Sequence, residues 1–201
     1  MSFVETSLIK AGLAPIAGVD EAGRGACAGP LVIASVILKD INAVELNGLR
    51  DSKELSEVER ENLFPIIQSQ AQALSVVIVA PLEIDHRGVH NANLDGMRRA
   101  VQSLEIAPAY VLTDGYAIAG LSIPSLAIWK GDQVAPTISA ASVIAKVTRD
   151  RIMTELDQDF PGYGLAKHKG YITAAHTKAL NELGVSKIHR RSYANIAKLL
   201  N

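Results

Sequence analysis

The stretch "IAGVDEAGRGACAGP", residues 16–30, places two adjacent acids, Asp20 and Glu21, directly after a short apolar run. The apolar residues predict a buried strand, and carboxylates at the end of such a strand are costly unless a cation meets them. The glycine-rich turn that follows lets backbone groups approach a ligand closely, because glycine lacks a Cβ. A plain tight turn is the simpler interpretation of the same glycines. The stretch therefore favours a first strand that ends at a cation-binding site, beside a turn that contacts a substrate.

Outward from this strand, further apolar runs predict the rest of a sheet. Residues 31–38 form a continuous apolar run, which is typical of a strand buried on both faces. Additional strands are expected within residues 73–80, 109–115 and 125–132. The last two of these runs each end in an acid, as the first strand does.

Helical signals separate and follow the strands. Ser56 and Glu59 have the spacing of a capping box at the start of a helix. Further helices are expected from Pro136 onward, at 173–183 and at 192–200. The "PGYG" segment at 161–164 breaks the longest helical pattern. Together the elements predict an α/β fold, in which a mixed five-stranded sheet is flanked by helices and followed by a helical C-terminal portion.

Length and composition indicate a single globular domain. The chain has 201 residues, of which 48% are hydrophobic, so a sizeable core is expected. No apolar run has membrane-spanning length and the N-terminus lacks the features of a secretory signal, so we expect a cytoplasmic protein with no membrane partner. The single cysteine, Cys27, is expected to be a small packing residue. Residues 1–201 are interpreted as one catalytic domain, of which about 161–201 form a helical extension.

The net charge of −1 conceals an uneven distribution. Residues 1–139 contain 10 Lys and Arg against 16 Asp and Glu, whereas residues 140–201 contain 10 against 5. A basic C-terminal third beside an acidic body suits a polyanion that must approach a group of acids. An ordinary solvated helical surface is the alternative explanation of the same asymmetry.

Acids at the ends of separate strands predict a metal site. The residues concerned are Asp20, Glu21, Asp114 and Asp132. Where strands run parallel, such ends converge at one edge of the sheet, where ligands bind. Neighbouring carboxylates raise one another's pKa, and a divalent cation removes the conflict. Oxygen ligands favour Mg²⁺ or Mn²⁺ over zinc, and two such ions support phosphodiester hydrolysis. Asp114 and Asp132 each lie next to a glycine, as ordinary turn residues do. The prediction of a metal site therefore depends on the occurrence of acids at the ends of three separate strands.

Six segments, in order along residues 16–193, resemble the motifs of the bacterial ribonuclease HII family. They are "GVDEAGRGACAGPLV", "LRDSKELSEVERENLF", "VLTDGY", "KGDQVAPTISAASVIAKVTRDRIM", "FPGYGLAKHKGY" and "IHRRSY". Six collinear matches are far more specific than one. The resemblance implies a ribonuclease H-like sheet with a helical C-terminal extension. It also implies an endonuclease that cleaves the RNA strand of RNA/DNA hybrids and nicks 5′ to single ribonucleotides in duplex DNA, leaving 3′-hydroxyl and 5′-phosphate ends.

The resemblance further implies roles for individual residues. The implied catalytic, metal-binding acids are Asp20, Glu21, Asp114 and Asp132, with Mg²⁺ or Mn²⁺ as cofactor. The implied substrate-binding residues are Gly23, Arg24, Gly25, Lys53, Lys146, Arg149 and Tyr171. Within that set, the Gly-Arg-Gly turn would contact the nucleotides around a ribo-to-deoxyribo junction. Tyr171 would stack on the sugar of the neighbouring deoxynucleotide, and the three other basic residues would contact phosphates.

Two positions depart from the family pattern. Ile172 follows Tyr171 where glycine or proline is more usual, which is expected to shift Tyr171 slightly. Gly96 lies inside a predicted helix and is expected to lower its stability by about 1 kcal/mol relative to alanine. Neither position is a predicted metal ligand.

The remaining polar and aromatic residues are expected to have ordinary structural roles. Solvated or capping positions are expected for His168, His176, His189, Arg190 and Arg191. Positions in the cores of strands are expected for Tyr110 and Trp129. No histidine has a second ligand at a spacing suited to zinc.

Two other functions stay open from the residues alone. A sugar kinase or ATPase on a related sheet also places acids at strand ends, but it needs phosphate loops and usually two such domains. An inactive hybrid-binding module would lack one of the four acids, and none is missing. The leading hypothesis is a monomeric endoribonuclease that acts on RNA/DNA hybrids and ribonucleotide-containing duplex DNA.

Overall fold

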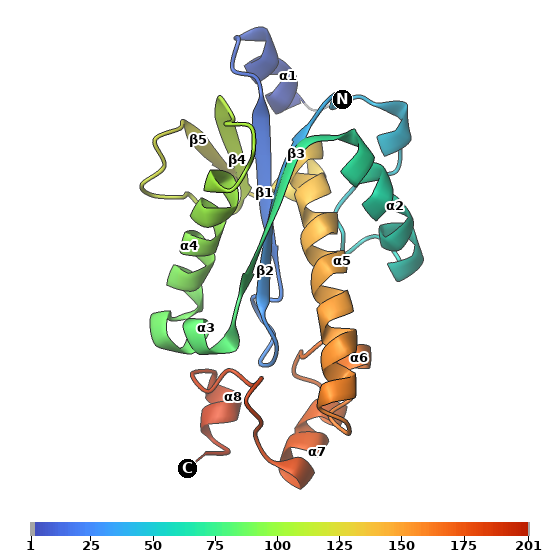
Figure 1. Cartoon of the computed structure of the whole chain (residues 1–201), viewed down its shortest axis with the longest axis vertical. Coiled ribbons are helices and arrows are strands. Elements are labelled where there is room, and N and C mark those ends of the chain that lie inside the picture. Colours follow the sequence, from blue (N-terminus) through green and yellow to red (C-terminus); the bar gives the residue numbers. More distant parts are fainter. Residues whose placement is uncertain (1–2, 201) are drawn as a thin grey trace.

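A computed structural model describes residues 3–200 and contains a five-stranded mixed sheet with helices on both faces (Figure 1). The strands are β1 (Ile16–Ala22), β2 (Leu31–Leu38), β3 (Ala71–Val79), β4 (Tyr110–Asp114) and β5 (Ser125–Ile128). Their order across the sheet is β3-β2-β1-β4-β5. The first three strands are antiparallel neighbours, whereas β1, β4 and β5 run parallel. The mixed five-stranded sheet predicted from the sequence is confirmed.

Helices cover both faces of this sheet. The α-helices of residues 3–200 are α1 (Phe3–Lys10), α2 (Glu57–Gln70), α3 (Pro81–Arg87), α4 (Val89–Gln102), α5 (Pro136–Asp159), α6 (Leu165–His168), α7 (Ala174–Leu183) and α8 (Ala194–Ala197). Two short 3-10 helices are η1 (Val44–Leu46) and η2 (Gly131–Gln133). Helices α3 and α4 lie on one face, α2 and α5 lie on the other, and α6 to α8 lie beyond one end of the sheet (Figure 1). None of these helices is both long and apolar enough to cross a lipid bilayer.

Strand β1 lies in the middle of the sheet, and its side chains alternate between the two helical layers. Val19 packs in the core under α4, whereas Asp20 faces α5, where Ser142 is its polar neighbour. At Gly18, α5 comes so close that a Cβ would lie 2.1 Å from the backbone carbon of Thr137. Glycine at this position therefore allows α5 to pack on β1 beside the acids.

Strand β2 is buried along its whole length, as its continuous apolar sequence predicts. Ile33 belongs to the core under α4, and Val32 belongs to the core under α2 and α5. Helix α4 approaches β2 at Gly96, where a Cβ would lie 2.6 Å from Cδ1 of Ile33. The glycine that was expected only to weaken this helix thus permits its close packing on the sheet.

The predicted helix boundaries largely agree with the structure. Ser56 and Glu59 form the reciprocal capping box at the start of α2. Helix α5 ends before "PGYG", and α7 ends at Gly184, whose φ of 78° suits glycine. The helix predicted at 192–200 is shorter than expected, because the α-helical hydrogen bonding is confined to one turn flanked by other turns.

The C-terminal region packs against the glycine-rich turn that follows β1. Cys27 and Ala28 are fully buried in an apolar cluster that includes Met153 and Tyr163, so the packing role predicted for Cys27 is confirmed. Ala28 also forms an isolated β-bridge with His189. Cys27 Sγ also donates to the carbonyl oxygen of Gly170, 143 positions later, so distant residues support one side of the turn.

Candidate metal centre and substrate-binding turn

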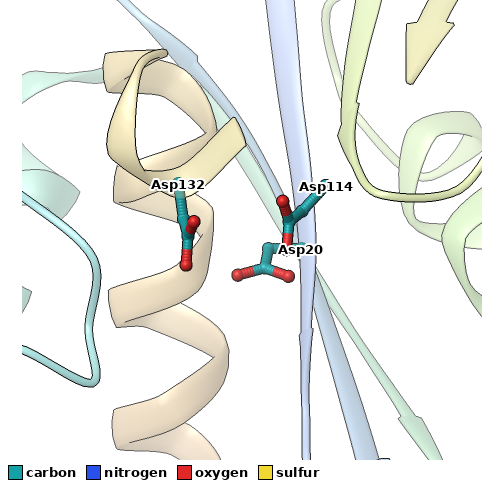
Figure 2. A group of neighbouring side chains, drawn as sticks. All are labelled: Asp20, Asp114 and Asp132. Atoms are coloured by element: carbon teal, nitrogen blue, oxygen red, sulfur yellow. The ribbon is translucent and has the colours of Figure 1, made fainter. Parts of the chain in front are cut away.

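Three aspartates meet at one edge of the sheet. Asp20 lies in β1, Asp114 is the last residue of the parallel strand β4, and Asp132 lies in η2. One oxygen from each carboxylate lies within 4.8 Å of the others, and Figure 2 shows the three side chains directed toward a common point. The convergence predicted from the sequence is therefore observed for these three acids.

The position of Asp132 differs from its predicted place at the end of a strand. Strand β5 ends at Ile128, and Asp132 follows in a 3-10 turn. This turn is attached to β4, because the Gly131 N–H donates to Asp114 Oδ1 at 2.7 Å. A Cβ on Gly131 would lie 2.5 Å from Cδ1 of Ile138, so a larger residue here would require the Ile138 side chain of α5 to move.

The electrostatics of this cluster favour a bound cation. Burial, followed by the charges of Glu21 and Asp114, raises the pKa of Asp20 well above its ordinary value. Burial and the neighbouring Asp114 raise the pKa of Asp132 to about 6. The buried Oδ2 of Asp132 accepts no hydrogen bond from the described residues 3–200, and Lys53 Nζ lies 3.6 Å from it. An all-oxygen set with an unsatisfied atom fits Mg²⁺ or Mn²⁺.

Glu21 stands apart from the three aspartates. As the residue after Asp20 in β1, it points to the opposite face of the sheet, toward α4. Burial raises its pKa to about 7, against the opposing charge of Arg24. Asn93 is completely buried, and both polar atoms of its side chain lack a hydrogen-bond partner among residues 3–200. The structure thus separates the four predicted acids into a group of three and a single residue beside an unsatisfied amide.

The Gly-Arg-Gly turn is shaped by buried arginines. Gly23 has a φ of 89°, and a Cβ there would lie 1.8 Å from Nε of Arg149. Arg149 donates to the carbonyl oxygens of Ala28 and Pro30, at 3.1 and 2.9 Å. Burial lowers the pKa of Arg149 to about 10. Arg149 therefore supports the turn from below, and its guanidinium is not exposed as a surface phosphate contact would be.

A second buried arginine supports the same turn. Arg190 donates to the carbonyl oxygens of Gly29 and Arg24, at 3.0 and 3.2 Å. It was expected to be solvated, and this prediction is wrong because its side chain satisfies backbone carbonyls that no strand pairs. Arg191 is exposed, as expected. Two buried guanidinium groups thus fix the path of the chain from Gly23 to Pro30.

Tyr171 lies beside the turn. Its ring would be 3.9 Å from a Cβ on Gly25, and the Arg149 guanidinium lies 5.5 Å from the ring centroid. The side chain is half-exposed, and Ile172 next to it is exposed, so neither is held by core packing. Arg24 lies over the ring of Tyr116, 4.9 Å from its centroid. The structure therefore brings together the predicted turn and the predicted tyrosine.

The two predicted lysines occupy different surroundings. Lys53 is 76% exposed, and its Nζ lies 3.6 Å from Asp132 and 3.9 Å from Asp51, at the rim of the acidic cluster. Lys146 forms an ion pair with Asp150 at 2.8 Å, and burial lowers its pKa. Lys53 is thus close to the acids, whereas Lys146 is occupied by a carboxylate on its own helix.

Several other predictions about single residues are wrong. Trp129 is 82% exposed, because it follows the last residue of β5 and lies outside the strand. His176 and His189 are fully buried, since they face each other between α7 and the segment before α8. The prediction for Tyr110 agrees with the structure, because it lies in β4 and packs partly buried against the core, whereas His168 is half-buried, with its ring bonded to the chain.

Known proteins that are similar to this chain show which family it belongs to. The sequence description of the family "Ribonuclease HII" matches residues 17–196, which include the three aspartates, Glu21, the Gly-Arg-Gly turn and Tyr171. The chain belongs to the ribonuclease HII family. It is 55% identical over 197 residues to the ribonuclease HII of Mycolicibacterium gilvum, covering 98% of this chain and 78% of that protein.

Solved structures of the family have the same architecture. The ribonuclease H2 of Pyrococcus horikoshii superposes with a TM-score of 0.79 at 30% identity, covering 92% of this chain and 96% of that chain. The ribonuclease HII of Archaeoglobus fulgidus, solved in complex with PCNA, gives 0.77 at 27% identity, covering 92% and 97%. The chain is therefore a ribonuclease H-like endoribonuclease of a divalent-metal-dependent family that acts on RNA/DNA substrates. The kinase or ATPase alternative is wrong.

The sequence analysis missed polar residues of this ribonuclease HII fold that border the acids. Ser52 and Ser142 share a hydrogen bond of 2.8 Å, and Gln133 donates to Asp51. The signal for Asp51 and Ser52 was present in "DSK", where only the lysine was singled out. Asn93 gave a weaker signal, as one polar residue on an otherwise apolar helical face.

Proposed function

We propose that this member of the ribonuclease HII family cleaves the RNA strand of RNA/DNA hybrids and also incises duplex DNA on the 5′ side of a single embedded ribonucleotide. The products would carry 3′-hydroxyl and 5′-phosphate ends, and the reaction would serve DNA replication and ribonucleotide excision repair. The observation that carries the proposal is the approach of three carboxylates within 4.8 Å, beside a glycine turn and an exposed tyrosine edge.

Asp20, Asp114 and Asp132 would hold Mg²⁺ or Mn²⁺, with Glu21 contributing from the other face of β1. Bound divalent ions supply an activated water and stabilisation of the leaving oxygen in phosphodiester hydrolysis. The protein's part is to fix the three carboxylates, which it does through the Gly131 N–H on Asp114 and the packing of α5 on β1. All four acids are proposed as catalytic and metal-binding residues.

The turn at Gly23, Arg24 and Gly25 is proposed to read the ribonucleotide. Its 2′-hydroxyl, which both donates and accepts a hydrogen bond, is what distinguishes it from the surrounding DNA. Reading it requires backbone groups close to the sugar, and a Cβ on Gly25 would have open space apart from Tyr171. Tyr171 is proposed to stack on the deoxyribose next to the junction, where a 2′-hydroxyl would hinder the ring.

The basic residues are proposed to divide into two roles. Lys53, exposed at the rim of the acidic cluster, is proposed to contact a phosphate near the scissile bond. Lys146 would contact a phosphate only by exchanging its Asp150 partner, and Arg149 is better placed to support the turn than to meet substrate. A monomeric state, a cytoplasmic location and one domain with a helical extension from about residue 161 also stay predictions.

The test uses a DNA duplex that contains one ribonucleotide and carries an end label. With Mg²⁺ or Mn²⁺ we expect one product, cut on the 5′ side of the ribonucleotide and ending in a 3′-hydroxyl that a polymerase can extend. An all-DNA duplex is the control, and a chelator should stop the reaction. Cleavage of long hybrids with no incision at the lone ribonucleotide would contradict junction reading but leave the metal centre in place. Binding without any cleavage would support an inactive hybrid-binding module instead.

A further inference from the structure

Three histidines form a cluster behind Tyr171. His168 ends α6, His176 lies in α7 and His189 lies in the segment before α8. The His168 and His176 rings stack with centroids 4.3 Å apart, and the His176 and His189 centroids are 5.3 Å apart. His176 and His189 are fully buried. None of the residues in the acidic cluster belongs to this group, so it needs a separate explanation.

Hydrogen-bond partners at the two ends of this cluster determine which ring nitrogens carry a proton. At one end the Ser186 N–H donates to His189 Nδ1 at 3.1 Å, so the proton of a neutral His189 lies on Nε2. At the other end, His176 Nδ1 lies 3.0 Å from the Tyr171 carbonyl oxygen, which only accepts, so the proton of a neutral His176 lies on Nδ1. The two Nε2 atoms are 3.1 Å apart, and these assignments make His189 the donor and His176 the acceptor.

A chain of three hydrogen bonds therefore runs from Ser186 through His189 and His176 to the Tyr171 carbonyl. Every ring nitrogen of these two histidines has a partner, and Ser186 Oγ also lies 2.9 Å from His189 Nδ1, where its hydroxyl can donate, so no two donors face each other. His168 adds to this order, because its Nδ1 accepts from the Gly170 N–H at 3.2 Å and its Nε2 lies 2.8 Å from the Tyr163 carbonyl oxygen.

The residues around His176 and His189 favour the uncharged form of both imidazole rings. Cys27 Sγ lies 3.8 Å from His176 Nδ1, the Tyr163 ring centroid is 5.0 Å from that of His189, and His168 stacks on His176. Arg190 is a permanent charge near Cys27, and its guanidinium is bonded to the carbonyl oxygens of Gly29 and Arg24. A second proton on His176 would set two N–H groups against each other at the Nε2 contact, and a second proton on His189 would set its Nδ1–H against the Ser186 N–H.

We propose that His176 and His189 are positioning residues, which hold the Tyr171 backbone through a neutral two-histidine hydrogen-bond relay and so place the Tyr171 ring beside the Gly-Arg-Gly turn. The inference rests on the proposed role of Tyr171 at the junction. The Tyr171 N–H also donates to the His168 carbonyl oxygen at 2.9 Å, but core packing does not hold the residue, since its side chain is half-exposed and its neighbour Ile172 is exposed. The relay thus gives a surface tyrosine a fixed backbone without burying its ring.

The tautomers provide a test that does not depend on activity. In ¹⁵N-labelled full-length protein at neutral pH, long-range ¹H–¹⁵N spectra distinguish the two tautomers of each ring and its charged form. We expect the Nδ1–H form for His176 and the Nε2–H form for His189, with exposed His86 as an internal control. A His176 ring with its proton on Nε2, or a charged ring at neutral pH, would overturn the relay.

A kinetic test examines whether the relay acts through Tyr171. In His176→Asn the amide can replace the Nδ1–H donor, whereas His176→Gln presents its amide near the Nε2 position and loses that donor. We expect His176→Gln to lower kcat for the single-ribonucleotide duplex about five- to tenfold, the size expected for one lost hydrogen bond, with a smaller change in KM. His176→Asn should recover most of the rate, and His86→Gln should leave it unchanged.

The decisive comparison adds Tyr171→Ala. If the relay acts through Tyr171, His176→Gln should have no further effect in the Tyr171→Ala background. An equal loss in both backgrounds would show a merely structural role and overturn the inference. If Tyr171→Ala alone leaves junction cleavage unchanged, the proposed role of Tyr171 fails and the relay's functional role fails with it. A strong Tyr171→Ala effect with normal His176→Gln kinetics would overturn the relay alone.

Discussion

The acidic cluster and the histidine cluster are both buried groups of titratable side chains, yet they differ in hydrogen bonding. His176 and His189 have a partner for every ring nitrogen, and the chain of bonds ends at a backbone carbonyl. In the acidic cluster Asp132 Oδ2 is buried without a hydrogen bond from any residue of the described part of the chain, beside two other carboxylates. A buried polar group is costly unless it is satisfied, so the unsatisfied cluster needs a ligand and the satisfied one does not. The comparison therefore distinguishes the acidic cluster, which is the proposed metal site, from the histidine cluster, which is proposed to hold the Tyr171 backbone.

The two clusters also give opposite dependences of stability on pH. In the metal-free protein the pKa of Asp132 is raised to about 6, so the folded state retains a proton that the unfolded chain releases near pH 4. Stability from this group falls as the pH rises from about 4 to about 6. The pKa of His189 is lowered to about 4 by burial and then by His176, so the unfolded chain binds the proton first as the pH falls. Stability from His189 falls as the pH drops from about 6.5 to about 4.

The largest expected effect comes from removing a carboxylate of the acidic cluster. Asp114→Asn should lower cleavage by a factor of about 10³ or more, because metal-assisted charge stabilisation contributes several kcal/mol. Hybrid binding should be largely retained, since the change removes no phosphate contact. The measurement is single-turnover cleavage together with binding of a labelled hybrid. Asp159→Asn changes an exposed carboxylate at the end of α5 and serves as the matched control. Full activity of Asp114→Asn would remove Asp114 from the mechanism.

The next effect concerns the turn between the two clusters. Gly23→Ala should lower incision at a single ribonucleotide about a hundredfold, because the added Cβ would meet Nε of Arg149 at 1.8 Å and displace the turn. Gly48→Ala is a close control, since Gly48 has a similar φ of 95° but no atom within 4 Å of its Cβ position. Comparable losses in both variants would trace the effect to backbone strain, and normal activity of Gly23→Ala would contradict the close approach.

A smaller effect should appear in the stability of the metal-free protein. Asp132→Asn removes a charge that the folded state accommodates poorly, so at pH 8 with a chelator it should stabilise the fold by about 1–3 kcal/mol. For a chain of this size that corresponds to a rise in Tm of roughly 2–10 °C. The rise should shrink at pH 5, where the wild-type carboxyl is mostly protonated, and Mg²⁺ should stabilise only the wild type. A lower Tm for Asp132→Asn at pH 8 would contradict the description of the acidic cluster.

The smallest expected effect belongs to the histidine cluster. Wild-type protein should lose about 1–2 kcal/mol of stability between pH 7 and pH 5 from His189, and His189→Phe should lose less over the same interval. The measurement is chemical unfolding at the two pH values, with exposed His86→Phe as the control. An unchanged difference in His189→Phe would show that this ring is not kept neutral by folding.

Much of the sheet was predictable from the sequence because its signals are local. The continuous apolar run of β2 indicated burial on both faces, and the capping box marked the start of α2. The meeting of Asp20 with Asp114 followed from the parallel pairing of their strands. The roles proposed for these acids and for the turn stay predictions, since geometry alone does not measure catalysis.

The failures share a physical cause, which is that long-range packing decides the burial of polar side chains. His176 and His189 have no sequence signal as a pair, because the hydrogen bond between them joins separate segments. Arg190 resembled a solvated residue but satisfies carbonyls of a turn more than 160 positions earlier. Trp129 resembled a core residue because it continues an apolar strand, yet β5 ends one residue before it.

The most direct test of the account is anomalous diffraction from crystals of the wild-type protein soaked in Mn²⁺. We expect an anomalous peak between the carboxylates of Asp20, Asp114 and Asp132, within about 2.0–2.3 Å of an oxygen from at least two of them. The histidine cluster should show no peak, because its ring nitrogens already bond to one another and to the chain. A peak at His176 and His189, or no peak among the three aspartates at saturating Mn²⁺, would contradict the account.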